Sequence, residues 1–184
     1  MKKENLKFLN NGRTLVVSGF PGIGKSECVR LFRNEEKIND TINLYDSDSS
    51  EYSWIINENG EKVRNPEFPK NYMKRIIDIS HIDDKKLNIV FVSTHKEVLD
   101  ALIENEIPFL CVYPSKELKD VFMKRYKNRG SDESFINLMD KKFNSFVEDL
   151  DNRFIKVDNQ LYTYYKCDTD EYLNQILIKL FIKL

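Results

Sequence analysis

A glycine-rich segment that directly follows a short run of β-branched residues constrains this chain more than any other feature. Residues 14–18 read TLVVS, which predicts a buried strand, and residues 19–26 read GFPGIGKS. The second segment fits the pattern G-x-x-x-x-G-K-[ST], in which glycines let consecutive backbone N–H groups turn toward a phosphate. Residues 27–33 then follow a helical pattern, so the positive end of a helix dipole is expected at the same place. The sequence therefore predicts a strand, a phosphate-binding loop and a helix.

This loop supplies the first candidate site residues. Lys25 is expected to neutralise the β- and γ-phosphates of ATP, and the hydroxyl of Ser26 is expected to bind Mg²⁺. The candidate nucleotide-binding residues are Gly19, Phe20, Pro21, Gly22, Ile23, Gly24, Lys25, Ser26 and Glu27. ATP and Mg²⁺ are therefore the expected cofactors.

The rest of the 184-residue chain alternates apolar runs with helical patterns. Further strands are expected at residues 41–45, 88–93, 108–113 and 154–157. Further helices are expected from Pro69 onward and at residues 95–105, 115–129, 132–150 and 170–183. Strands separated by helices imply an α/β fold, with a mostly parallel sheet and helices on both faces. The length suits a single domain over residues 1–184, in which residues 151–184 hold the last strand and the C-terminal helix.

Two aspartates follow the second predicted strand, in the stretch Asp46-Ser47-Asp48. Because the carboxyl ends of parallel strands meet at one edge of the sheet, this stretch is expected beside the phosphate-binding loop. Carboxylates there can hold Mg²⁺ through water or accept a proton from an attacking hydroxyl. We assign Asp46 to the metal and Asp48 to the substrate or to catalysis as a base. An ordinary polar turn is the alternative.

The third predicted strand ends in FVSTH, without the acid that many nucleotide hydrolases place there to hold Mg²⁺. This absence disfavours a GTPase or a motor ATPase and leaves more of the metal chemistry to Asp46 and Asp48. Ser93, Thr94 and His95 could contact a phosphate or the substrate. Helix capping by Ser93 or Thr94, with His95 at the surface, is the favoured interpretation.

About forty residues lie between Asp48 and the third predicted strand, more than an ordinary crossover needs, which predicts a substrate-binding insert over residues 51–86. Its aromatic and cationic side chains suit a nucleobase and a monophosphate. The candidate substrate contacts are Trp54, Arg64 and Tyr72, with Arg64 as the ligand for the substrate phosphate. The alternative is that the aromatic residues form a small core within the insert.

Cations outnumber acids between residues 116 and 130, where Arg125 and Arg129 lie four residues apart and share a helix face. Phosphoryl transfer gains mainly from charge stabilisation and from the exclusion of water. We therefore predict a lid over residues 115–132 that brings both guanidinium groups to the transferred phosphate. A solvated cationic face is the alternative.

Charge and composition exclude several classes of protein. Lys and Arg number 29 against 30 Asp and Glu, and this balance argues against a nucleic-acid coat or a membrane-surface protein. No apolar run is long enough for a transmembrane helix, and no pattern in the sequence specifies an oligomer. The three cysteines lie far apart, which suits the reducing cytoplasm and argues against a metal or redox pair.

Several stretches resemble known proteins. GFPGIGKS, the Asp46-Ser47-Asp48 stretch and RYKNRG at residues 125–130 look like the nucleoside monophosphate kinase branch of the P-loop kinases. Four further stretches are similar to small phage-encoded proteins labelled adenylate kinase-like or P-loop ATPase: SDSSEYSW, RNPEFPKNYMKRI, FVSTHKEVLDAL and VYPSKELKDVFMKRY. This second resemblance covers most of residues 14–150.

The resemblance implies a three-layer P-loop fold with a five-stranded parallel sheet in the order 2-3-1-4-5, an insert after the second strand and a lid after the fourth. It also implies that Lys25 binds phosphates, that Ser26 binds Mg²⁺, and that Arg125 and Arg129 stabilise the transferred phosphoryl group. The Asp-x-Asp stretch resembles that of shikimate- and gluconate-type kinases, in which such acids serve metal and substrate. Residues 91–96 read FVSTHK where adenylate kinases carry D-G-F-P-R. A deoxynucleotide, a modified nucleotide and a small alcohol therefore stay open as acceptors beside AMP.

Three functions follow from these patterns. The first is an ATP-dependent phosphotransferase acting on a small acceptor, above all a (deoxy)nucleoside monophosphate, with Lys25, Asp48, Arg125 and Arg129 as catalytic residues. The second is an ATP-binding regulatory or partner protein with weak hydrolysis, which the missing acid at the third strand favours. The third is a kinase acting on modified bases or ends of nucleic acid, against which the near-neutral net charge of −1 argues.

Overall fold

A parallel sheet forms the centre of the computed structural model, which describes residues 6–9, 12–33, 35, 40–82, 85–155 and 161–182. Its five strands lie in the order β2-β5-β1-β6-β7, and every neighbouring pair is parallel. The strands are β1 (Thr14–Gly19), β2 (Ile42–Asp46), β5 (Leu87–Ser93), β6 (Phe109–Pro114) and β7 (Tyr162–Cys167). Numbered along the chain within this sheet, the spatial order is second, third, first, fourth and fifth.

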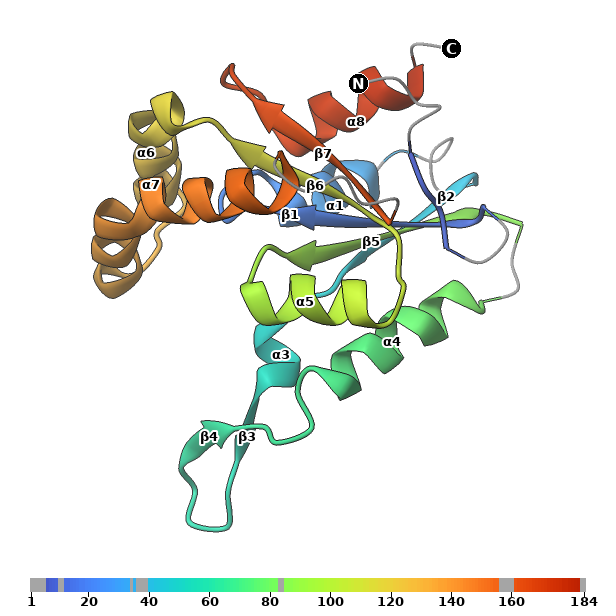
Figure 1. Cartoon of the computed structure of the whole chain (residues 1–184), viewed down its shortest axis with the longest axis horizontal. Helices are drawn as coiled ribbons and strands as arrows, with labels where there is room; N and C mark the ends of the chain where they lie inside the picture. The colour runs from blue at the N-terminus through green and yellow to red at the C-terminus, as the bar shows by residue number, and fades with distance from the viewer. Residues whose placement is uncertain are drawn as a thin grey trace.

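Helices cover both faces of this sheet (Figure 1). They are α1 (Lys25–Arg33), α3 (Ser50–Ser53), α4 (Lys70–Ser80), α5 (Lys96–Glu104), the 3₁₀ turn η2 (Lys116–Leu118), α6 (Lys119–Asn128), α7 (Glu133–Phe154) and α8 (Leu173–Ile182). Helices α4 and α5 lie on one face and α1 and α8 on the other, while α6 and α7 pack against each other beside β6. The predicted α/β architecture, a parallel sheet flanked by helices, is confirmed. Within the described residues, no helix is both long enough and apolar enough to cross a membrane.

Strand β1 and its neighbour β6 have every residue buried. A parallel strand that is covered by helices on both faces has no side that faces solvent, so an uninterrupted apolar run is stable there. This explains why TLVVSG and FLCVYP carry no charged side chain. The glycine-rich loop, residues 19–26, therefore emerges from the most buried part of the sheet.

The predicted fifth strand at residues 154–157 is wrong, because Phe154 is the last residue of α7. The buried stripe of α7 consists of Met139, Phe143, Val147, Leu150 and Phe154. Its spacing of three or four residues continues to Phe154, so this side chain completes the packing face of a helix. The edge strand is β7 instead, where the aromatic run YTYYKC pairs with β6. Residues 156–160 lie outside the described part of the chain.

The insert after β2 contains the short helix α3 and a hairpin that projects away from the sheet (Figure 1). The hairpin consists of β3 (Trp54–Ile56) and β4 (Lys62–Arg64), which pair in antiparallel fashion. Gly60 in the connecting turn has a φ of +79°, a conformation that glycine adopts without steric cost. The pairing places Trp54 opposite Arg64, so the hairpin presents an aromatic ring and a cation together.

Phe20 of the glycine-rich loop packs with Phe122 and Phe143 in an aromatic cluster, and from this packing we predict a large effect on stability. The ring centroid of Phe143 lies 5.3 Å from that of Phe20 and 5.7 Å from that of Phe122, and all three residues are buried. We expect Phe143→Ala to lower the free energy of unfolding by about 3–5 kcal/mol, because it leaves a cavity. Phe146→Ala, on a more exposed side of the same helix, is expected to cost less than about 1 kcal/mol. Urea denaturation measures both variants, and equal losses would contradict this packing.

Candidate functional site

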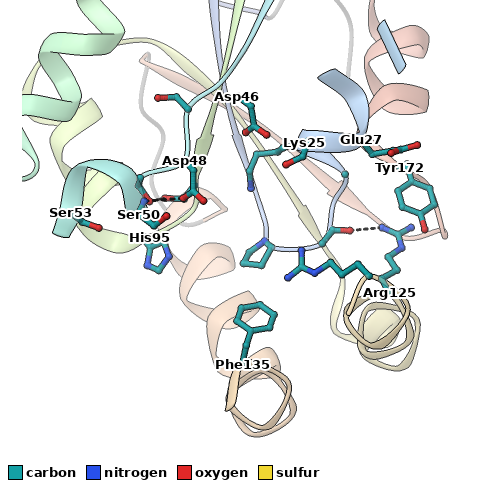
Figure 2. A pocket seen from close by; sticks show the side chains of 18 of the residues that line it. Lys25, Glu27, Asp46, Asp48, Ser50, Ser53, His95, Arg125, Phe135 and Tyr172 are labelled. Atoms are coloured by element: carbon teal, nitrogen blue, oxygen red, sulfur yellow. Dashed lines mark hydrogen bonds between the residues drawn. The ribbon is translucent and has the colours of Figure 1, made fainter. Parts of the chain in front are cut away.

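A cleft of about 1060 Å³ lies at the carboxyl ends of the strands, which is the edge where open parallel sheets bind ligands. Its walls are the glycine-rich loop, the segment after β2, the hairpin, the start of α5, the end of α6, the start of α7 and the segment that enters α8. Figure 2 shows Lys25, Asp46, Asp48 and His95 on one side of the loop. The same view shows Arg125 and the Tyr172 ring on the other side.

Two glycines let the loop turn and enter α1. The φ angles are +80° at Gly22 and +103° at Gly24, in the left-handed region that other residues rarely adopt. A Cβ atom on Gly22 would also lie 2.6 Å from Cε1 of Tyr126. The close approach of α6 therefore excludes any side chain at this position.

Donors from the C-terminal half of the chain bind the carbonyl groups of the loop. The Tyr126 hydroxyl donates to the Pro21 carbonyl at 2.9 Å, and the Leu173 backbone N–H donates to the Ile23 carbonyl at 2.8 Å. The Gly22 carbonyl between them is bound by α6 as well. Three successive carbonyls are therefore directed at α6 and α8.

The backbone N–H groups of the same loop are in the opposite situation. In the described part of the chain, no acceptor contacts the N–H of Gly22, Gly24, Lys25 or Ser26. Lys25 and Ser26 begin α1, and the first N–H groups of a helix have no partner within it. These groups form a cradle of positive potential at the N-terminus of α1, which suits an anion.

Lys25 lies beside this cradle. Its ammonium donates a hydrogen bond of 2.6 Å to the Gly19 carbonyl. Burial lowers the pKa of Lys25 to about 8, while the negative charges of Asp46 and Asp48 act to raise it. At neutral pH the side chain is therefore still mostly protonated, and it can neutralise an anion bound at the loop.

Asp46 and Asp48 both line the cleft at the end of β2. The Ser47 N–H between them donates to the Phe91 carbonyl at 3.0 Å, so the pairing of β2 with β5 continues past the end of the strand. The carboxylate of Asp48 accepts a hydrogen bond from the Ser50 N–H at 2.9 Å. The backbone turn at the start of α3 therefore orients Asp48.

A Mg²⁺ ion bound together with ATP fits the residues of this cleft. Ser26 supplies a hydroxyl and Asp46 a carboxylate, and both line the cleft. Mg²⁺ usually keeps several waters and takes one or two protein ligands in addition to phosphate oxygens. Among the described residues, no group of three or more His, Cys, Asp or Glu side chains could hold a metal by itself. The ion would therefore depend on the nucleotide for most of its ligands.

Arg125, the first predicted lid arginine, lines the cleft but is only 8% exposed. Its guanidinium lies 3.9 Å from the centroid of the Tyr172 ring, and Nη1 donates to the Gly22 carbonyl at 3.1 Å. Nη2 contacts the Asp170 carboxylate and the Glu171 carbonyl. A guanidinium can be buried in this way because its face stacks on a ring while its edge donates hydrogen bonds. Arg125 therefore holds the loop against the segment that enters α8 and does not approach from solvent.

Arg129, the second predicted lid arginine, keeps an exposed side chain that lines the cleft. Its guanidinium lies 5.1 Å from the centroid of the Tyr126 ring and 5.2 Å from that of Phe135. Nε donates to the Ser131 hydroxyl at 2.6 Å. These contacts orient the positive charge without burying it, so Arg129 remains able to contact a bound anion.

The structure shows that Tyr72, a predicted substrate contact, does not line the cleft. It is fully buried, and its hydroxyl donates to the Ser47 carbonyl at 2.6 Å. Its ring lies 5.0 Å from that of Tyr52 and 6.0 Å from that of Phe68, between centroids. The predicted role is therefore wrong, and Tyr72 belongs to a small aromatic core that supports the segment after β2.

Three residues of the predicted nucleotide-binding set do not line the cleft: Gly19, Phe20 and Ile23. Phe20 and Ile23 are 1% and 0% exposed. Phe20 packs edge-on against Phe143, and its N–H donates to the Val112 carbonyl of β6 at 2.9 Å. These side chains fix the loop on the sheet, a role that the pattern cannot show because it leaves their residue type open.

Trp54 and Arg64, the other predicted substrate contacts, both line the cleft. Arg64 forms an ion pair with Glu97 at the start of α5. Its guanidinium also lies 5.5 Å from the centroid of the Trp54 ring and 4.7 Å from that of Phe68. The positive charge that was expected to bind a substrate phosphate is therefore already engaged within the protein.

One wall of the cleft, made by the segment that enters α8, was not expected from the sequence. Tyr172, Asn174 and Gln175 line the cleft, and a Cβ atom on Gly24 would lie 3.0 Å from Cδ1 of Tyr172. This segment follows β7, and the carboxyl end of a parallel strand is where such a wall is expected. Because the last strand was expected at residues 154–157, the segment after residue 167 was not expected at the carboxyl end of a strand.

His95 lies at the surface as expected, but the expected helix capping by Ser93 or Thr94 is wrong. His95 is exposed, but it lines the cleft, and it is itself the N-cap position of α5. No side-chain hydrogen bond caps this helix, so neither Ser93 nor Thr94 has the expected role. The strand-end residue that sequence reasoning set aside therefore belongs to the candidate site.

Comparisons with known proteins name no family for this chain. No protein-family model matches the sequence, and no curated protein matches it. Among solved structures, one described as "Crystal structure of APE1195" superposes with a TM-score of 0.41 at 17% sequence identity, over 94% of this chain and 94% of that chain. That description names no activity, so the function is argued from the cleft itself.

The position of Arg125 predicts a stability effect that a solvent-exposed lid arginine would not have. We expect Arg125→Ala to lower the free energy of unfolding by about 2–3 kcal/mol, because the Gly22 carbonyl loses a charged donor. Lys124→Ala, at an exposed position of the same helix, is expected to change it by less than about 0.5 kcal/mol. Urea denaturation without nucleotide measures both. If Arg125→Ala is as stable as the wild-type protein, Arg125 does not stabilise the loop, and the result would favour the lid role instead.

Proposed function

We propose that this protein is an ATP-dependent phosphotransferase that moves the γ-phosphate of Mg·ATP to a small acceptor. The cradle at the glycine-rich loop carries the proposal: the carbonyls of residues 21–23 are bound by α6 and α8, while N–H groups at the start of α1 have no acceptor among the described residues. Such a cradle with a lysine beside it suits the phosphates of a nucleotide. The observed strand order supports a P-loop fold of the nucleoside monophosphate kinase type.

Binding of the donor phosphates follows from the loop contacts. Lys25 exchanges its hydrogen bond to the Gly19 carbonyl for one to a phosphate oxygen, and its charge offsets the negative charge that develops during transfer. Ser26 and Asp46 would hold Mg²⁺, which neutralises phosphate charge when bound. Arg129, whose guanidinium stays exposed in the cleft, contacts the transferred phosphoryl group.

The nucleoside part of the donor has a wall of its own. Tyr172 is 42% exposed, and its ring is held by the Arg125 guanidinium beside it. Leu31 of α1 is 36% exposed and lines the same cleft, as do the amide side chains of Asn174 and Gln175. An aromatic face, an apolar side chain and two amides suit the stacking and the polar edge of a nucleobase.

The acceptor then lies against the remaining wall, made by the segment after β2, the hairpin and the start of α5. Asp48, Trp54 and Arg64 line this wall. The resemblance to nucleoside monophosphate kinases makes ribo- and deoxynucleoside monophosphates the first acceptors to examine.

Lys25→Ala tests the phosphotransferase assignment. We expect ADP formation from Mg·ATP to fall at least about 100-fold, because the lysine stabilises charge that develops in the transition state. The assay measures ADP with and without nucleoside monophosphates, nucleosides, polyols and single-stranded DNA. Lys116→Ala, a lysine outside the cleft that pairs with Glu148, serves as the matched control. Unchanged turnover of Lys25→Ala would reject the role of the loop.

An ATP-binding regulatory protein is the second candidate. Strand β5 ends at Ser93 and continues with Thr94 and His95, so the strand beside β1 offers no carboxylate for the metal. This favours slow turnover. The regulatory function predicts ATP binding that Lys25→Ala abolishes, with no stimulation of ADP formation by any acceptor in the panel.

A further inference from the structure

The wall that faces the acceptor carries more negative than positive charge. This acceptor wall consists of Asp48, Trp54, Arg64, His95 and Glu97. Arg64 is its one arginine or lysine among the described residues, and it is engaged by Glu97 and by the rings of Trp54 and Phe68. A phosphate group entering here would meet the carboxylates of Asp48 and Glu97. Lys62, whose ammonium lies 5.5 Å from the centroid of the Trp54 ring, does not line the cleft.

The other cationic side chains of the cleft lie around the glycine-rich loop. Lys25 and Arg125 donate to carbonyls of the loop itself, and Arg129 lies against aromatic rings of α6 and α7. Their charges surround the place where the donor phosphates bind. The cleft is therefore divided into a cationic donor half and an acidic acceptor half.

Five serine residues line the acidic half as well. They are Ser47, Ser49 and Ser53, which are buried, Ser93, which is half-buried, and Ser50, which is exposed. The Oγ atoms of Ser49 and Ser93 lie 3.0 Å apart, and the buried Oγ of Ser47 has no hydrogen-bond partner within the described residues. Hydroxyl groups both donate and accept, so they suit a neutral molecule that carries hydroxyls of its own.

His95 is the uncharged base of this half. The loss of hydration at the cleft lowers the pKa of His95, and the positive charges of Lys25 and Arg64 lower it further, while Asp48 and Glu97 raise it. These four groups face it from α1, β4, the segment after β2 and α5. The net lowering leaves the imidazole neutral at neutral pH, so that a ring nitrogen can accept a proton.

We propose that the acceptor presents an uncharged hydroxyl group at the acceptor wall, and that His95 takes its proton. The proposal rests on the phosphotransferase function and narrows it to a class other than the monophosphates that the resemblance implies. The acceptor oxygen forms a bond to the γ-phosphorus, the bond to the β,γ-bridging oxygen breaks with its electron pair leaving on ADP, and the hydroxyl proton passes to His95. An acceptor phosphate is already anionic and needs no such base.

Trp54, the single tryptophan of the chain, reports binding at the acceptor wall. The protein is first saturated with Mg²⁺ and a non-hydrolysable ATP analogue, which fills the donor half. Adenosine, thymidine and glycerol are then titrated in parallel with AMP, dTMP and inorganic phosphate while Trp54 emission is recorded. We expect each nucleoside to bind at least about tenfold more tightly than its monophosphate. A monophosphate or inorganic phosphate that binds more tightly than the uncharged compounds overturns the proposal.

Glu97→Gln tests the charge of the wall without requiring that the natural acceptor be known. Removal of this carboxylate releases Arg64, so we expect AMP to bind at least about tenfold more tightly than in the wild-type protein. Glu104→Gln, at the exposed end of the same helix, should leave AMP binding unchanged. Equal AMP affinity in the wild-type protein and Glu97→Gln overturns the proposed charge-based selection.

His95→Gln tests the proton acceptor. Transfer to the best uncharged acceptor is expected to fall about 100-fold while ATP affinity stays the same, and the loss of activity toward acid pH should disappear. His81→Gln, the other histidine of the chain and outside the cleft, is the matched control. Full turnover of His95→Gln overturns the proposal. Failure of the phosphotransferase function itself would give a different result. No acceptor would then stimulate ADP formation, while the Trp54 titrations would still show tighter binding of the uncharged compounds than of the phosphates.

Discussion

The binding of the loop carbonyls by α6 and α8 is the interaction on which the rest of this site depends. A turn that directs several N–H groups toward one point must direct its carbonyls elsewhere, and carbonyls left without donors inside a protein are costly. Tyr126 and Arg125 supply donors from more than 100 positions further along the chain. The N-terminal loop is therefore completed by the C-terminal half, and the anion binding that we propose would depend on the docking of α6 and α8.

This use of Arg125 leaves the charges of the cleft in two groups. Lys25 and Arg129 lie on the side of the loop, while Asp48 follows β2 and Glu97 lies at the start of α5. In-line phosphoryl transfer needs positive charge around the moving group and a proton acceptor behind a hydroxyl nucleophile. The two halves of the cleft match these two requirements of the phosphoryl transfer to an alcohol that we propose.

The parts of the site that could be predicted from the sequence are those that depend on local pattern. Lys25 and Ser26 line the cleft because the strand, the loop and the helix that position them are contiguous. Arg125 and Arg129 show what the local pattern does not predict. Both are cations on one helix face, and the pattern therefore gives them the same role. Their environments differ because Asp170, 45 positions beyond Arg125, pairs with only one of them. A contact between residues so far apart in the chain does not depend on the spacing of residues within one helix, so the sequence pattern of α6 does not reveal it.

The wrong prediction of the edge strand concerns the same contact between Arg125 and Asp170. Residues 154–157 and 162–167 both carry β-branched or aromatic side chains, and the helical stripe ending at Phe154 decides between them. Because the strand is β7, its carboxyl end delivers Asp170 and Tyr172 to the glycine-rich loop, where the Arg125 guanidinium binds both. A strand ending at residue 157 would deliver a segment other than the one that carries Asp170 and Tyr172. The position of one edge strand thus determines whether the arginine of α6 supports the loop or remains free to close over it.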